Sequence, residues 1–231
     1  MTDSGFRFEH EMASSARDWL MRQGLKVKEE FYTPWGVCDM VGVKLDRRKV
    51  RKRLRLGQKY PMGPLIRLEI LNAIPDAVEG EWITLEELAH KYRDLLTRAE
   101  VCAEIDKLLT GKFVRQGEDR TLQKVNGWAP LQTRLVAIEL KLNRVEEALG
   151  QAISHQAFAG ESFVGLPAGL AERVATSPRA GRFQAEGVGI LSVGRNLSRV
   201  VLRPQPRLQK IDPGFQMHCV ERFWRTEVRG S

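Results

Sequence analysis

The chain has 231 residues, of which 42% are hydrophobic, and its formal net charge is +8. This composition supports one large or two small cores, and no apolar run approaches the roughly 18 residues that span a membrane. The charge favours a polyanionic partner, nucleic acid ahead of a membrane surface, although a merely basic protein would look the same. Three widely separated cysteines argue against a disulfide framework or a zinc knuckle. We expect a cytoplasmic protein without a secretory signal segment.

Residues 6–22 have the period of an amphipathic helix that ends near Gly24. Stepping back along its apolar stripe leads to Glu9, whereas Glu11 lies nearer the polar face. Glu9 is therefore the better placed of the two to lean toward the core. Both acids would also complement the helix dipole in the first turn.

Two strands follow, over residues 25–30 and 37–44, and the second contains Asp39. Aspartate is disfavoured within strands, so its position there calls for a functional or structural reason. Residues 46–59 then carry eight basic side chains. This run is typical of a solvated connector and would also suit contacts to a phosphate backbone.

Residues 58–131 form a separate small unit in this interpretation. Helices are predicted over 63–73, from Thr84, and over 97–110, and Thr84 with Glu87 has the spacing of a capping box. A hairpin is predicted over 111–125, and this order resembles a winged helix-turn-helix. That resemblance implies phosphate contacts from four basic residues: Arg98, Arg115, Arg120 and Lys124. Acidic residues on the third helix leave a protein-interaction module nearly as good an interpretation.

A strand over residues 134–142 places Glu139 and Lys141 side by side on one face. Charges on a half-buried strand persist because they pair, bind a metal or do chemistry. A helix over residues 143–158 follows, in which Gln151 lies among apolar neighbours and His155 is expected to be on the surface or packed. Residues 161–167 are predicted to form another buried strand.

The order of a strand, an Asp strand, a Glu-x-Lys strand, a helix and a strand resembles the core of the PD-(D/E)XK nuclease-like superfamily. The resemblance implies that Asp39 and Glu139, with the Leu140 carbonyl, hold Mg²⁺ or Mn²⁺, helped by Glu9. It places Lys141 beside the attacking water and gives Gln151 a supporting hydrogen bond. A solvent-exposed Gln151 is the alternative. Cys38 stands where the motif has proline.

The expected fold is therefore α/β (α+β): a restriction endonuclease-like core with a central mixed sheet, interrupted by a winged-helix domain. The core would comprise residues 1–57 and 132–231, including a basic tail. Within it we predict a helix over 166–175, a loop over 177–182, strands over 187–193 and 200–202, and a last helix over 215–227.

The resemblance, together with the basic charge, implies a Mg²⁺-dependent endodeoxyribonuclease that acts on double-stranded DNA. We expect no membrane partner, and a homodimer is one possible assembly. One alternative is a DNA-binding regulator that uses the winged helix, with the nuclease-like core as scaffold. Another is an interaction protein.

Overall fold

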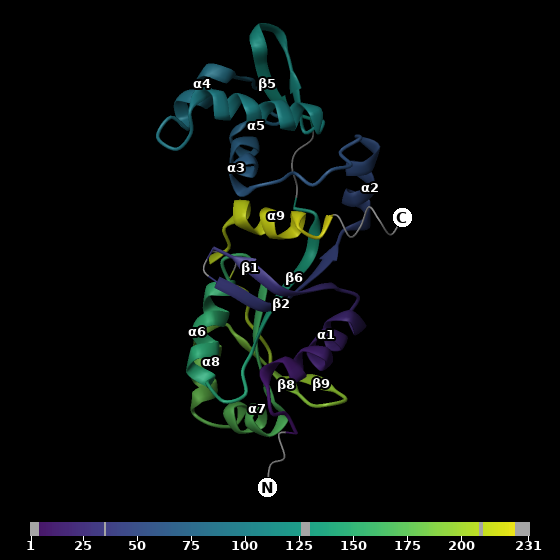
Figure 1. Cartoon of the computed structure of the whole chain (residues 1–231), viewed down its shortest axis with the longest axis vertical. Helices are drawn as coiled ribbons and strands as arrows, with labels where there is room; N and C mark the ends of the chain where they lie inside the picture. Colours follow the sequence, from purple (N-terminus) through teal and green to yellow (C-terminus); the bar gives the residue numbers. More distant parts are fainter. Residues whose placement is uncertain (1–4, 35, 126–129, 208–209, 225–231) are drawn as a thin grey trace. The chain divides into compact units, whose positions relative to one another are not determined.

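A computed structural model describes residues 5–34, 36–125, 130–207 and 210–224 (Figure 1). The chain folds into two compact units. Unit 1 comprises Met1–Lys44 and Gln132–Asp212, and unit 2 comprises Leu45–Leu131 and Pro213–Ser231. Among the helices in these described ranges, none is long and apolar enough to cross a membrane.

A six-stranded mixed sheet forms the centre of unit 1. Its strands are β1 (Lys26–Thr33), β2 (Gly36–Leu45), β6 (Gln132–Leu140), β7 (Glu161–Pro167), β8 (Gly189–Val193) and β9 (Ser198–Leu202). They are arranged in the order β1-β2-β6-β7-β8-β9. The β1/β2 and β8/β9 pairs are antiparallel, whereas β6, β7 and β8 are parallel. The predicted mixed sheet is confirmed.

Helices cover both faces of this sheet. The short η1 (Glu9–Met12) continues into α1 (Ala13–Arg22), whose buried Ala16 and Leu20 pack with Ile138 and Phe163. These residues belong to one hydrophobic cluster. A second hydrophobic cluster contains Val164, together with residues of α6 (Val145–His155), α7 (Ala168–Ala175) and α8 (Arg179–Glu186). Successive strand residues point to opposite faces, so the two clusters lie on opposite sides of the sheet.

The predicted loop over residues 177–182 is wrong, because α8 begins at Arg179. Pro178 precedes the helix and Gly187 ends it with φ +70°. Proline at the start and a left-handed glycine at the end are the usual asymmetric boundary signals of a helix. Phe183 buries its ring beneath α8 and ties the helix to the core.

The described residues of the continuous part of unit 2 form four α-helices and a small antiparallel sheet, and α9 (Pro213–Glu221) follows later in the chain. The helices are α2 (Arg47–Arg55), α3 (Leu65–Ala73), α4 (Leu85–Lys91) and α5 (Arg98–Thr110). The strands β3 (Ile83–Thr84), β4 (Val114–Gln116) and β5 (Thr121–Lys124) pair in the order β3-β5-β4, with η2 (Glu118–Arg120) between β4 and β5. Capping boxes start α4 at Thr84 and α5 at Thr97.

The basic run after β2 is a helix, not the connector that its composition predicts. Asp46 caps α2 by accepting hydrogen bonds from Arg48 N at 2.8 Å and Lys49 N at 3.3 Å. Arg53 is buried and forms an ion pair with Glu221 of α9. That pair joins α2 to the end of the chain, so residues 45–57 and 213–231 group with unit 2 instead of with the predicted core.

Trp35 lies in the sequence between the first two predicted strands, and Trp128 and Ala129 lie near the end of the predicted inserted unit. These three residues lie outside the described ranges, as does the end of the last predicted helix.

Candidate metal and hydrolysis site

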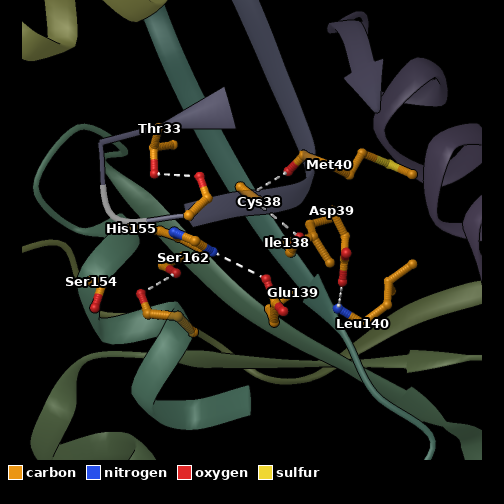
Figure 2. Close-up of polar contacts among 12 residues, drawn as sticks. Thr33, Cys38, Asp39, Met40, Ile138, Glu139, Leu140, Ser154, His155 and Ser162 are labelled. Carbon is orange, nitrogen blue, oxygen red and sulfur yellow. Dashed lines mark hydrogen bonds and ion pairs between the residues drawn. The ribbon is translucent and has the colours of Figure 1, made fainter. Parts of the chain in front are cut away.

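Asp39 and Glu139 belong to neighbouring strands of the unit 1 sheet, although 100 positions separate them. Asp39 lies in β2 and Glu139 in β6, which are adjacent in the sheet. The Leu140 N–H donates a hydrogen bond of 2.7 Å to Asp39 Oδ2, as Figure 2 shows. The sheet therefore brings the Asp39 carboxylate to the segment that carries Glu139 and Lys141.

Glu139 and Lys141 form a buried ion pair at the carboxyl end of β6. The Lys141 Nζ lies 2.9 Å from Glu139 Oε1, and the two residues are only 6% and 1% exposed. The Lys141 N–H donates to the Gly165 carbonyl at 3.1 Å, which holds its backbone against the end of β7. The predicted side-by-side placement of the two charges is thus present in the structure.

Glu9 joins this pair from the start of the first helix. Its Oε1 accepts from Leu142 N at 3.3 Å, and its Oε2 lies 3.7 Å from Lys141 Nζ. Glu11 turns elsewhere and accepts from the Arg7 N–H at 2.7 Å. Of the two acids left open by the sequence, Glu9 is the one beside Lys141.

Asp39, Glu139, Glu9 and Lys141 are here called the carboxylate–lysine cluster. Burial and the nearby Glu139 charge raise the pKa of Asp39, against the Leu140 hydrogen bond. Burial alone would raise the pKa of Glu139, but hydrogen bonds from His155 and Lys141 outweigh it and lower that pKa. Burial likewise opposes the charge of Lys141, yet Glu139, Asp39 and Glu9 together raise its pKa. Lys141 is therefore an ammonium and Glu139 a carboxylate at neutral pH.

His155 is a buried member of the site that the sequence did not assign. Its Nε2 lies 3.1 Å from Glu139 Oε2, as Figure 2 shows, and the residue is 6% exposed. An ionised carboxylate only accepts hydrogen bonds, so Nε2 carries the proton. Both oxygens of Glu139 are thus held by donors. The sequence contained a signal for the burial of His155, because this residue continues the stripe of Ala148 and Ala152, which is buried in α6.

Cys38 lies close to both Glu139 and His155. Its thiol donates weakly to the carbonyls of Met40 at 3.4 Å and Ile138 at 3.6 Å. Burial raises its pKa, so the group is a thiol and not a thiolate. Potential ligand atoms of Cys38, Glu139 and His155 all lie within 4.8 Å of one another. Sulfur and imidazole ligands suit zinc, whereas the carboxylates of the cluster suit Mg²⁺ or Mn²⁺.

No protein-family model matches this chain, and no curated protein matches it. A solved structure, the SPO1766 protein of unknown function from Silicibacter pomeroyi, resembles it over 97% of this chain and 89% of that chain. The two are 10% identical, with a TM-score of 0.45. That level of similarity carries no argument about function.

Gln151 does not contact the cluster through a hydrogen bond among the described residues. Its Oε1 is buried and has no hydrogen-bond partner in that part of the chain. A hydrogen bond from Gln151 to a catalytic group is therefore not formed among the described residues, and a hydrogen bond to substrate stays a prediction. Gln151 as a whole is half-buried, so part of its side chain is open to solvent although its Oε1 is not.

The basic residues predicted to contact phosphate lie in unit 2 and differ in their surroundings. Arg98 pairs with Glu86 at 2.5 Å on the surface. The Arg115 Nε donates a hydrogen bond of 3.0 Å to Gln123 Oε1, and the Arg115 guanidinium lies 5.2 Å from the Trp82 ring centroid. Arg120 has a positive φ of 58° next to β5, and Lys124 ends that strand. Two of the four cations are thus already engaged by protein groups.

Proposed function

We propose that unit 1 is a metal-dependent nuclease of the PD-(D/E)XK type that hydrolyses phosphodiester bonds of DNA. The observation that carries the proposal is the meeting of Asp39 with Glu139 and Lys141 across adjacent strands. A metal-dependent hydrolase needs carboxylates to hold the ion and a donor near the attacked phosphate. The cluster supplies both types of group.

The residues present fit a hard divalent cation. Three carboxylates, Asp39, Glu139 and Glu9, gather around one lysine, and mutual repulsion contributes to the raised pKa of Asp39. A divalent cation would relieve that repulsion, and oxygen donors are those that Mg²⁺ and Mn²⁺ prefer. Asp39 and Glu139 would hold the ion, with Glu9 and the Leu140 carbonyl as further oxygen donors. When bound, the ion would supply charge neutralisation at the phosphate and a more acidic water.

The charge of Lys141 favours one of its possible roles. Because its carboxylate neighbours raise its pKa, Lys141 is protonated and donates hydrogen bonds. A protonated amine orients a water molecule and stabilises negative charge that develops on the phosphate oxygens. It does not remove a proton from the water. His155 is a positioning residue here, because it holds Glu139 Oε2.

Unit 2 supports a nucleic-acid partner through two features. The order α3-β3-α4-α5-β4-β5 with a three-stranded sheet is similar to that of a winged helix. In addition, α2 carries an exposed basic face without an ion pair in the described part of the chain. Its members are Arg47, Arg48, Arg51, Lys52 and Arg55. Such unpaired cations suit contacts to a phosphate backbone better than the engaged Arg98 does.

Cleavage assays with the purified chain test this proposal. Single- and double-stranded DNA and RNA would be incubated with Mg²⁺, with Mn²⁺ and with EDTA. We expect metal-dependent cleavage of DNA that Glu139→Gln abolishes, while Glu147→Gln on the exposed side of α6 retains it. Glutamine is chosen because alanine would leave the Lys141 ammonium buried without its partner. Circular dichroism of each variant shows that the fold is kept.

Metal binding without cleavage of any nucleic acid would overturn the nuclease proposal. If DNA still bound under those conditions, the regulator alternative would take its place, with unit 2 as the binding element. Failure to bind nucleic acid at low salt would leave the interaction-protein alternative.

A further inference from the structure

A hollow of about 380 Å³ opens in unit 1 at the carboxyl ends of two parallel strands. It is bounded by the segment after β6, by the end of β7, by the first turn of α7 and by the residue Phe6 near the N-terminus. Its described lining includes Phe6, Leu142, Asn143, Pro167, Leu170 and Arg173. Ligands of open α/β sheets commonly bind in this kind of place, beyond the carboxyl ends of the strands.

The hollow adjoins the carboxylate–lysine cluster. Leu142, which lines it, donates its N–H to Glu9 Oε1 at 3.3 Å and directly follows Lys141 in the chain. The parallel register places Leu140 beside Gly165, so the lining residue Pro167 lies level with Leu142. A ligand held at the cluster can therefore extend into the hollow without leaving unit 1.

The lining combines an aromatic ring, aliphatic side chains and polar groups. Leu142, Pro167 and Leu170 give it an apolar part, and the half-buried Phe6 offers an aromatic face. The Arg195 guanidinium lies 5.9 Å from the Phe6 ring centroid and donates to the Gly5 carbonyl, but Arg195 is not a lining residue. Asn143 is exposed and has an amide that both donates and accepts, and Arg173 adds a positive charge.

These groups match the parts of a nucleotide. A base stacks on an aromatic face, its polar edge pairs with an amide, and arginines attract the phosphate. A hollow of this size is at the lower end for a small-molecule site and takes a single such unit. Inside a duplex both faces of a base are already stacked and its pairing edge is occupied, so only an unpaired or extruded base could enter.

We propose that this hollow is a subsite for one unpaired nucleotide next to the phosphate attacked at the carboxylate–lysine cluster. The inference rests on the proposed nuclease function and refines its substrate. The favoured substrate becomes DNA with a single-stranded segment, in place of a fully paired duplex.

Binding is tested with a single-stranded DNA oligonucleotide that carries the fluorescent base 2-aminopurine, in Mg²⁺ and in the Glu139→Gln background. Adding Phe6→Ala is expected to weaken binding about 5- to 150-fold, the range of a lost base–aromatic stack. The matched control is Phe8→Ala, because Phe8 is 59% exposed and does not line the hollow. It is expected to bind within about twofold of its parent. Unaltered affinity in Phe6→Ala would overturn the proposal.

Asn143→Ala provides a second test in case the Phe6 variant misfolds, since Asn143 is exposed and removing its amide leaves the core intact. It too is expected to weaken binding of the single-stranded oligonucleotide while leaving that of a blunt duplex unchanged. Equal losses on the two DNAs would contradict a subsite for an unpaired base.

Cleavage separates the two proposals. If the unaltered chain cleaves DNA and Phe6→Ala raises the KM for single strands with little effect on kcat, both stand. If it cleaves and Phe6→Ala has no effect, the subsite is wrong and the nuclease stands. If it never cleaves but 2-aminopurine binding depends on Phe6, the nuclease is wrong and a nucleotide-binding hollow remains.

Discussion

Asp39→Asn should make the metal-free protein more stable and make it unable to bind its metal. The raised pKa of Asp39 means that its carboxylate charge is unfavourable in the fold, through burial first and then through Glu139. Asparagine keeps an oxygen that can accept from Leu140 N but carries no charge. Single stabilising substitutions, including those that remove an unfavourable charge, commonly add about 0.5–2 kcal/mol.

The dependence on pH follows from the direction of that shift. Folded Asp39 binds its proton more tightly than the unfolded chain does, so its unfavourable contribution is complete above the folded pKa. The advantage of Asp39→Asn should therefore be full at neutral pH. It should shrink as the pH falls through the folded pKa of Asp39, and vanish below the ordinary value of 3.8, where both states are protonated.

Saturating metal should reverse the order of stability, so that the unaltered protein becomes more stable than Asp39→Asn. A ligand at about 100 times its Kd stabilises the folded state by about 2.7 kcal/mol, and the variant should gain little of this. The assay is urea unfolding of both proteins in EDTA and in Mn²⁺, with hydrogen exchange of β6 and β7 peptides to report on unit 1. Asp18→Asn, at an exposed position of α1, is the control and should change stability by less than about 0.5 kcal/mol. The reasoning would be refuted if Mn²⁺ did not raise the free energy of unfolding of the wild-type protein, or if it stabilised Asp39→Asn equally.

Three further predictions concern other contacts. His155→Ala should reduce cleavage about 10- to 100-fold and raise the pKa of Glu139. The change in pKa should appear as an upward shift of the acidic limb of the pH–rate profile. An unchanged profile would count against a positioning role. Glu221→Ala should destabilise unit 2 by about 3–5 kcal/mol in chemical denaturation, because Arg53 is 1% exposed and would lose the carboxylate that pairs with it. A loss under about 1 kcal/mol would argue against a buried pair. Neutralising the exposed basic face of α2 with glutamines should flatten the dependence of DNA affinity on salt by several units of slope, and an unaltered slope would place the DNA elsewhere.

Local signals in the sequence predicted most elements of the fold. The capping box at Thr84 starts its helix as expected, because the motif needs only residues three positions apart. The alternation around Glu139 likewise predicted a strand with Glu139 and Lys141 side by side, and the structure has both the strand and the ion pair. Such features depend on neighbours in the chain, which a single sequence displays.

Features that depend on distant partners could not be predicted in this way. Arg53 looks like one more cation in a basic run, and its burial follows from Glu221, 168 positions away. The partner of His155 is likewise on another element, so its spacing alone suggested a surface or packed residue. Gln151 differs from both, because the resemblance gives it a hydrogen bond to a catalytic group or to substrate, and its Oε1 has no partner in the described chain.

The most direct test of the central claim is anomalous X-ray scattering from crystals soaked in Mn²⁺. The account predicts a peak at about 2.0–2.3 Å from carboxylate oxygens of both Asp39 and Glu139, absent from crystals of Asp39→Asn. A peak confined to Cys38 and His155, or no peak at the cluster under saturating Mn²⁺, would contradict it.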